Sequence, residues 1–180
     1  MKIRFYFIIV IILFFESCHD NYHKLSGVTH APYHITFQSN NPDKLEKLVQ
    51  NEFRKYYHSL NPFDSLSIIS QMNQNKNVKI DSIFIKTFKK TQQISELSDG
   101  MFDVTCAPLI NLWGFGFSKM DSVTSKTTDS LLTFVGYQKV KLENNEIIKD
   151  DPRILLNFSA LGDGCICDLV ADLFDKNGIE

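Results

Sequence analysis

Residues 140–174 have the sequence VKLENNEIIKDDPRILLNFSALGDGCICDLVADLF, and this stretch contains the two periodicities that decide the fold. Two short apolar runs flank the polar residues 143–146, which predicts a β-hairpin. Residues 154–156 predict a further strand, and apolar residues at helical spacing predict a final helix from about Gly164. A mixture of antiparallel strands and helices indicates an α+β fold.

The part of the chain before this stretch is predicted to be mainly helical. Asn41 followed by Pro42 is typical of a helix start, and an apolar stripe predicts that this helix continues to Asn61. Asp81 is predicted to cap another helix, which ends before Gly100. A shorter helix is expected over residues 65–72, and strands over residues 33–37 and 78–80. The polar residues 118–130 are expected to loop into a short helix.

The first residues have the features of a leader that is removed from the mature chain. A positively charged start precedes an apolar run over residues 5–15, which is shorter than the roughly 20 residues of a membrane-spanning helix. Ser17 and Cys18 follow, as at a bacterial lipoprotein cleavage site. We predict that residues 1–18 form a lipoprotein signal peptide with Cys18 lipidated, and that residues 19–31 form a tether. The alternative is an ordinary signal peptide with a chance cysteine.

Composition limits the function classes open to this chain. It has 180 residues, of which 43% are hydrophobic, enough to bury one sizeable core. A formal net charge of -2 argues against a nucleic-acid-binding protein, which usually has a basic face. Cys106, Cys165 and Cys167 lack the spacing of a zinc site and are interpreted as small apolar packing residues. The five histidines are scattered without metal-ligand spacing.

Residues 99–116, DGMFDVTCAPLINLWGFG, form the first segment that could carry chemistry. Asp103 and Thr105 lie on one face if the segment is extended. Trp113 and Phe115 offer flat apolar surfaces of the kind that hold planar rings. The segment is therefore either a loop that binds an aromatic ligand or a core turn with buried aromatic side chains.

The second segment covers residues 156–168, LNFSALGDGCICD, where a strand is followed by a Gly-x-Gly turn and a helix. Backbone N–H groups at such a helix start suit a phosphate, although the same pattern also serves as an ordinary tight turn. Asp163 in the turn would repel a phosphate unless a cation lies between them. Mg²⁺ takes oxygen ligands and shares them with phosphates, so it would resolve this conflict.

Together with residues 59–73, SLNPFDSLSIISQMN, these segments resemble in order the FAD:protein FMN transferase family, or ApbE family. The resemblance implies an ApbE/T-fold-like α+β fold, with a mixed or antiparallel sheet and flanking helices. It also implies that residues 32–180 are the N-terminal part of a flavin transferase domain that is incomplete at its C-terminus. The family's Asp…Thr segment, which supplies its main Mg²⁺ ligands, is not found in the sequence.

The resemblance implies an enzyme that uses Mg²⁺ to transfer FMN from FAD to a Thr or Ser side chain of a partner flavoprotein, with release of AMP. Many relatives are lipoproteins on the outer side of the cytoplasmic membrane. We therefore expect a chain held by a lipid anchor on the periplasmic side of the inner membrane. The expected partners are FAD, an acceptor flavoprotein and the membrane, but no nucleic acid.

Site residues also follow from the resemblance, position by position. Ala160 matches a position that offers an oxygen to Mg²⁺, here its backbone carbonyl. Asn157 stands where relatives usually carry Asp, and Asp163 stands where they carry Lys or Glu. No catalytic residue is assigned. The positions expected to contact FAD are Phe63, Met101, Phe102, Asp103, Asn157 and Asp163.

The Gly-rich turn departs from the family pattern, because Gly162-Asp163-Gly164-Cys165 replaces the common Ala-Lys-Gly-Tyr. This departure keeps two alternatives open: a membrane-tethered flavin-binding lipoprotein without transfer activity, and an inactive truncated homologue. A lipoprotein with a structural or partner-binding role is the third hypothesis.

Overall fold

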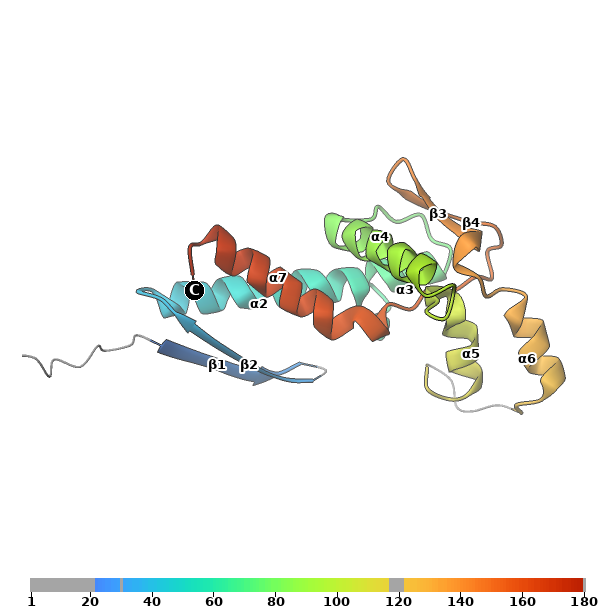
Figure 1. Cartoon of the computed structure of the whole chain (residues 1–180), viewed down its shortest axis with the longest axis horizontal. Coiled ribbons are helices and arrows are strands. Elements are labelled where there is room, and N and C mark those ends of the chain that lie inside the picture. Colours follow the sequence, from blue (N-terminus) through green and yellow to red (C-terminus); the bar gives the residue numbers. More distant parts are fainter. Residues whose placement is uncertain (1–21, 30, 117–121, 180) are drawn as a thin grey trace, which may run out of the picture. The chain divides into compact units, whose positions relative to one another are not determined.

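The computed structural model describes residues 22–29, 31–116 and 122–179 (Figure 1). The predicted signal peptide and Cys18 lie outside these residues. The chain divides into two compact units: Met1–Lys47 with Phe174–Glu180, and Leu48–Leu173. None of the described helices is long and apolar enough to cross a membrane.

The first unit contains an antiparallel hairpin of β1 (Tyr22–Val28) and β2 (Pro32–Gln38). Its core includes buried Phe37, whose ring lies edge-on to Phe174 with ring centroids 5.6 Å apart. Strand β2 confirms the strand expected at residues 33–37. The residues of strand β1 were expected to be part of a tether, and this prediction is wrong for them. Leu25 is the one buried side chain of β1, so its sequence has almost no apolar alternation.

Two helices begin where their predicted capping residues place them, and a third begins later. Helix α2 (Pro42–Leu60) follows Asn41, whose Oδ1 accepts the N–H of Lys44 at 3.2 Å. Helix α4 (Ser82–Leu97) begins after Asp81, whose Oδ1 accepts the N–H of Phe84 at 2.8 Å. Helix α3 (Ile68–Asn73) starts three residues later than expected, because Ser67 caps it.

The core of the second unit forms where α2, α3 and α4 meet the later segments. Phe84 and Phe88 are almost completely buried, and the Phe84 ring lies edge-on to Phe158 at 5.3 Å between centroids. Cys165 packs against this core, as predicted, whereas Cys167 is exposed and does not. The other buried members are Tyr56, Leu60, Ile68, Ile69, Met72, Ile80, Val104, Val140, Ile154 and Leu156.

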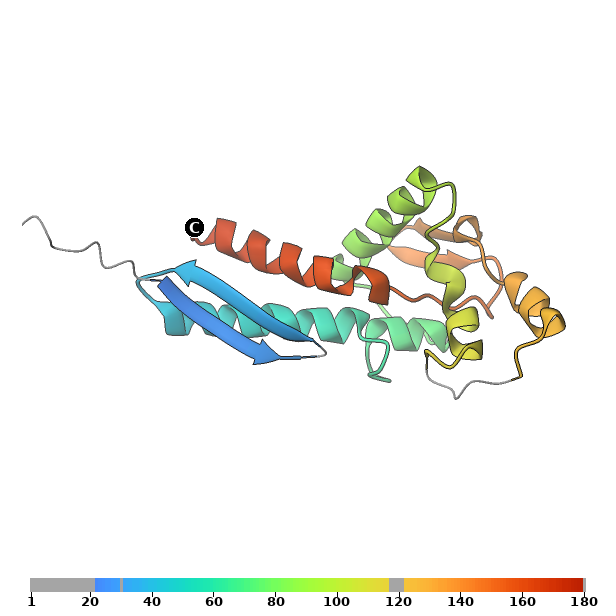
Figure 2. The same cartoon turned by 60° about the horizontal axis from the view of Figure 1, so that its bottom comes forward.

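The hairpin predicted around residues 143–146 is confirmed as β3 (Val140–Glu143) and β4 (Glu146–Lys149). Asn144 and Asn145 both have positive φ, which matches the tight turns that join twisted antiparallel strands. Strand β3 contacts α4 (Figure 2).

The strands in the described residues pair as two separate antiparallel hairpins, so the fold is α+β with small sheets. The residues predicted as strands at 78–80 and 154–156 join neither hairpin. The remaining elements are η1 (Val104–Cys106), α5 (Ala107–Leu112), α6 (Ser125–Leu132), η2 (Tyr137–Lys139), η3 (Ser159–Leu161) and α7 (Gly162–Lys176).

Candidate functional site

Three apolar side chains of residues 99–116 lie on the surface, whereas Phe102 packs partly buried against the core. Trp113 is 52% exposed, Phe115 is 82% exposed and Met101 is 89% exposed. The prediction of a core turn with buried aromatic side chains is therefore wrong for Trp113 and Phe115. Three exposed apolar side chains within fifteen residues are consistent with the alternative, a loop that binds an aromatic ligand.

Asp103 and Thr105 form a hydrogen-bonded hub rather than one face of an extended segment. Asp103 Oδ1 accepts the N–H of Thr105 at 2.7 Å and its hydroxyl at 2.6 Å. Asp103 Oδ2 accepts the N–H of Tyr137 at 2.7 Å, and the Thr105 hydroxyl oxygen accepts the N–H of Gly136 at 2.7 Å. Both carboxylate oxygens thus accept hydrogen bonds from backbone N–H groups, so the Asp103 side chain fixes the position of this segment.

Two sets of hydrogen bonds join the three motif segments. The Asn157 N–H donates to the Val104 carbonyl at 2.8 Å, which links the Gly-rich turn to η1. The Asn73 side chain bonds both backbone groups of Leu156, because Nδ2 donates to the carbonyl and Oδ1 accepts the N–H, each at 2.8 Å. The segment before the turn is therefore held by a side-chain amide, as a neighbouring strand would hold it.

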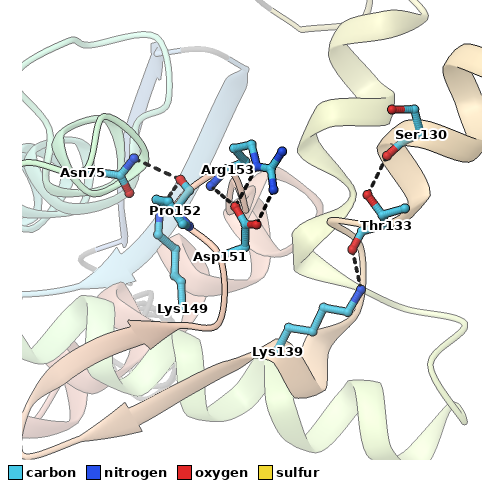
Figure 3. Close-up of polar contacts among 8 residues, drawn as sticks. All are labelled: Asn75, Ser130, Thr133, Lys139, Lys149, Asp151, Pro152 and Arg153. Carbon is cyan, nitrogen blue, oxygen red and sulfur yellow. Dashed lines mark hydrogen bonds and ion pairs between the residues drawn. The ribbon is translucent and has the colours of Figure 1, made fainter.

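Polar side chains also fix the loop that follows β4 (Figure 3). Lys149 Nζ donates to the carbonyl of Pro152 at 3.3 Å. It also donates to the carbonyl of Ile154 at 3.0 Å. Asn75 donates to the same Pro152 carbonyl at 2.9 Å. Burial lowers the pKa of Lys149, because desolvation disfavours its charged form. Lys149 thus holds this loop in place through hydrogen bonds to two of its backbone carbonyls.

Asp151 and Arg153 close the same loop (Figure 3). Arg153 Nη2 lies 2.6 Å from Asp151 Oδ2, and the Arg153 N–H and Nε both donate to Oδ1. The side-chain hydrogen bond from Arg153 lowers the pKa of Asp151 to about 2. The Arg153 guanidinium also lies 4.2 Å from the centre of the Phe134 ring, in cation–π geometry.

The Gly-rich turn starts from Asn157, whose Oδ1 accepts the N–H of Ser159 at 2.7 Å. A short 3-10 turn over Ser159–Leu161 then leads into α7, which begins at Gly162, two residues before the expected start. Ala160 and Asp163 are exposed at this start. Phe63, in the loop between α2 and α3, is 74% exposed.

The described residues contain no cluster of side chains that commonly hold a metal ion. No three His, Cys, Asp or Glu side chains among residues 22–29, 31–116 and 122–179 are grouped so that they could hold a metal ion. Ala160 could offer only its backbone carbonyl. Mg²⁺ prefers near-octahedral oxygen coordination, which this arrangement does not supply.

Sequence patterns missed two residues that shape the site. Tyr56 was one member of an apolar stripe, but its hydroxyl lies against the first residue of α7: a Cβ built on Gly162 would meet it at 2.7 Å. Tyr137 donates its backbone N–H to Asp103 across 34 residues of sequence. Neither contact has a local sequence signal, because both depend on tertiary structure.

Comparison with known proteins gives consistent matches. Residues 30–180 match the sequence model of the ApbE family. The FAD:protein FMN transferase of Vibrio cholerae serotype O1 is 28% identical over 140 residues, which cover 77% of this chain and 41% of that protein. The FAD:protein FMN transferase of Buchnera aphidicola subsp. Schizaphis graminum is 27% identical over 184 residues, which cover 94% and 54%. The chain thus spans about half the length of the curated relatives it matches.

Solved structures give the same fold. A point mutant of the flavin transferase ApbE from Vibrio cholerae matches with a TM-score of 0.80 and 25% identity, over 88% of this chain and 58% of that chain. The apo form of the Pseudomonas stutzeri flavinyl transferase ApbE matches with a TM-score of 0.83 and 23% identity, over 89% and 57%. The family match covers most of this chain and all three motif segments, so the chain belongs to the ApbE family.

Proposed function

We propose that this chain serves the transfer of FMN from FAD to a Thr or Ser side chain of a partner flavoprotein. The family match over residues 30–180 carries the proposal. In this reaction the acceptor hydroxyl oxygen bonds to the phosphorus on the FMN side of FAD. The bond from that phosphorus to the AMP half breaks, and AMP leaves while the hydroxyl proton passes to solvent or to the leaving phosphate.

The residues proposed to contact FAD differ in what they can offer. Phe63 and Met101 are exposed apolar side chains that can cover a planar ring. Phe102 directly precedes the hub, in which the Asp103 carboxylate holds Thr105 and Tyr137 in place. The remaining proposed contacts, at the Gly-rich turn, are Asn157 and Asp163.

Magnesium dependence enters the proposal through the resemblance, with the Ala160 carbonyl as one ligand. A complete site needs oxygen ligands beyond those that the described residues group together. Asp163 is an exposed acid at the turn, where it opposes a phosphate. The acid at the turn favours a second candidate function: a flavin-binding protein without transfer activity.

Titration of the full chain with FAD, with and without Mg²⁺, tests the proposal. We expect FAD binding that tightens with Mg²⁺, and chromatography should then detect AMP and FMN. Replacement of Trp113 by Ala should weaken FAD binding about tenfold if its ring stacks on the ligand, since stacking on an aromatic side chain contributes about 1–3 kcal/mol. Leu132→Ala, at an exposed apolar side chain of α6, is the matched control.

Each outcome of this titration has one meaning. Binding with AMP release supports transfer. Binding without AMP release, even when a candidate acceptor is added, favours the second candidate. A full chain that binds no FAD under either condition contradicts a flavin function for it.

We also propose that Cys18 is lipidated and holds the chain on the periplasmic side of the inner membrane. The apolar run and the Ser17-Cys18 pair support this proposal. Cell fractionation should find the chain with the membranes, and Cys18→Ala should remove the lipid mass from the mature N-terminus. An unmodified Cys18 in the mature wild-type protein would rule the anchor out.

A further inference from the structure

Tyr56 has a buried ring and a hydroxyl group that is not used internally. The residue is 5% exposed and lies in α2, where its ring packs edge-on to Tyr57. Its hydroxyl makes no hydrogen bond within the part of the chain that the structure describes. Buried tyrosine hydroxyls usually have a partner, so this one is available for a bond that the protein itself does not make.

The hydroxyl is not sealed inside the core. Ser95 Oγ is the one fully buried side-chain nitrogen or oxygen without a partner among the described residues. The Tyr56 hydroxyl, which makes no hydrogen bond within the described residues, is therefore not fully buried, although the residue as a whole is 5% exposed.

The hydroxyl lies at the start of α7, a helix of fifteen residues. A Cβ built on Gly162, the first residue of the helix, would meet the Tyr56 oxygen at 2.7 Å. Apart from its chain neighbours and the backbone of its own helix, it would meet no other residue within 4 Å. The positive end of a helix favours anions, and its first N–H groups point toward them. Tyr56 thus adds an O–H donor to a helix start that already favours a phosphate.

We propose that the Tyr56 hydroxyl donates a hydrogen bond to a phosphate oxygen of the flavin nucleotide at the start of α7. The inference rests on the proposed flavin function and extends it, because it assigns a binding role to a residue outside the motif segments. The turn carries the acid Asp163 and no basic residue. A neutral donor is therefore the kind of group that can bind phosphate here without forming an ion pair with that acid.

The surroundings of Tyr56 keep its hydroxyl protonated, so that it can donate a hydrogen bond. Burial raises the pKa of Tyr56, and nearby Cys165, Tyr57 and Asp163 raise it further. The phenol therefore stays protonated at neutral pH. Gly162 completes the arrangement, because any larger residue would occupy the space that the hydroxyl needs.

Tyr56→Phe tests the proposal, because it removes the hydroxyl and keeps the ring. We expect isothermal titration of the full chain to show FAD and FMN bound about tenfold more weakly, as for a hydrogen bond to a charged group, with riboflavin affinity unchanged. Tyr57→Phe, the neighbouring tyrosine of the same helix, should leave all three affinities unchanged.

Gly162→Ala provides a second, independent arm. In the wild-type background the new methyl group should displace the hydroxyl and weaken FAD and FMN binding. In the Tyr56→Phe background, Gly162→Ala should cause no further loss of affinity. Without the hydroxyl, the nearest ring atom, Cζ, lies 3.9 Å from the new Cβ, which is an ordinary contact.

The outcomes separate the inference from the proposed function. If the Tyr56→Phe variant binds FAD as tightly as the wild type, the role of Tyr56 is overturned and the flavin function is unaffected. An equal loss for riboflavin overturns the phosphate contact. A wild-type chain that binds neither FAD nor FMN overturns both.

Discussion

Replacement of Asp103 by alanine is expected to lower the free energy of unfolding by about 3 kcal/mol. The substitution removes the acceptor of three hydrogen bonds and leaves the backbone N–H groups of Thr105 and Tyr137 without it. Unsatisfied groups of this kind cost about 1–3 kcal/mol each, and their effects overlap within one network. Urea unfolding followed by the fluorescence of Trp113, the single tryptophan, measures the change.

Two further variants make this test specific. Asp129→Ala removes an exposed carboxylate from α6 and should change stability by less than about 0.5 kcal/mol. Asp103→Asn keeps one oxygen but places an NH₂ group against one of the N–H donors, so it should recover only part of the loss. Equal stability of the Asp103→Ala and Asp129→Ala variants would show that the hub does not stabilise the fold.

The Asp103 hub also bears on the proposed site. The segment that it fixes carries exposed Met101 on one side and the Val104 carbonyl that binds the Asn157 N–H on the other. A change at Asp103 should therefore weaken flavin binding at least in part through displacement of these neighbours.

Local chemistry predicted the helices well. The starts of α2 and α4 followed from Asn41 and Asp81, because a capping side chain bonds an N–H only three residues away. The β3–β4 hairpin followed from its two-residue turn in the same way. Strand β1 did not, since its pairing with β2 buries one side chain, Leu25, and leaves little pattern to detect.

The candidate site could be predicted only in part. The motif segments were recognised, but the resemblance did not show that the Asp103 carboxylate is used to hold Tyr137, 34 residues later. Tyr56 looked like any other residue of an apolar stripe, because periodicity does not distinguish a hydroxyl that reaches another helix. Residues 154–156 looked like a strand, yet they join neither hairpin, and both backbone groups of Leu156 bond the side chain of Asn73.

The Asn73 side chain gives the second large expected effect on stability. Replacement of Asn73 by alanine should lower the free energy of unfolding by about 3–4 kcal/mol, because the N–H and the carbonyl of Leu156 lose their bonds together. Leu156 is 1% exposed, so water cannot easily take the place of the amide. Gln74→Ala, at the exposed neighbouring side chain, should have little effect in the same urea unfolding experiment.

Asn73→Asp separates the two bonds. An ionised Asp can still accept the Leu156 N–H, but it faces the Leu156 carbonyl without a donor, so this variant should be much less stable than wild type at pH 7. Protonation restores a donor, which raises the folded-state pKa of the new carboxyl group. Its stability relative to wild type should therefore improve as the pH falls through that raised pKa. A deficit that does not change with pH would show that the donor half of the pair contributes nothing, and that Asn73 holds the segment through the Leu156 N–H alone.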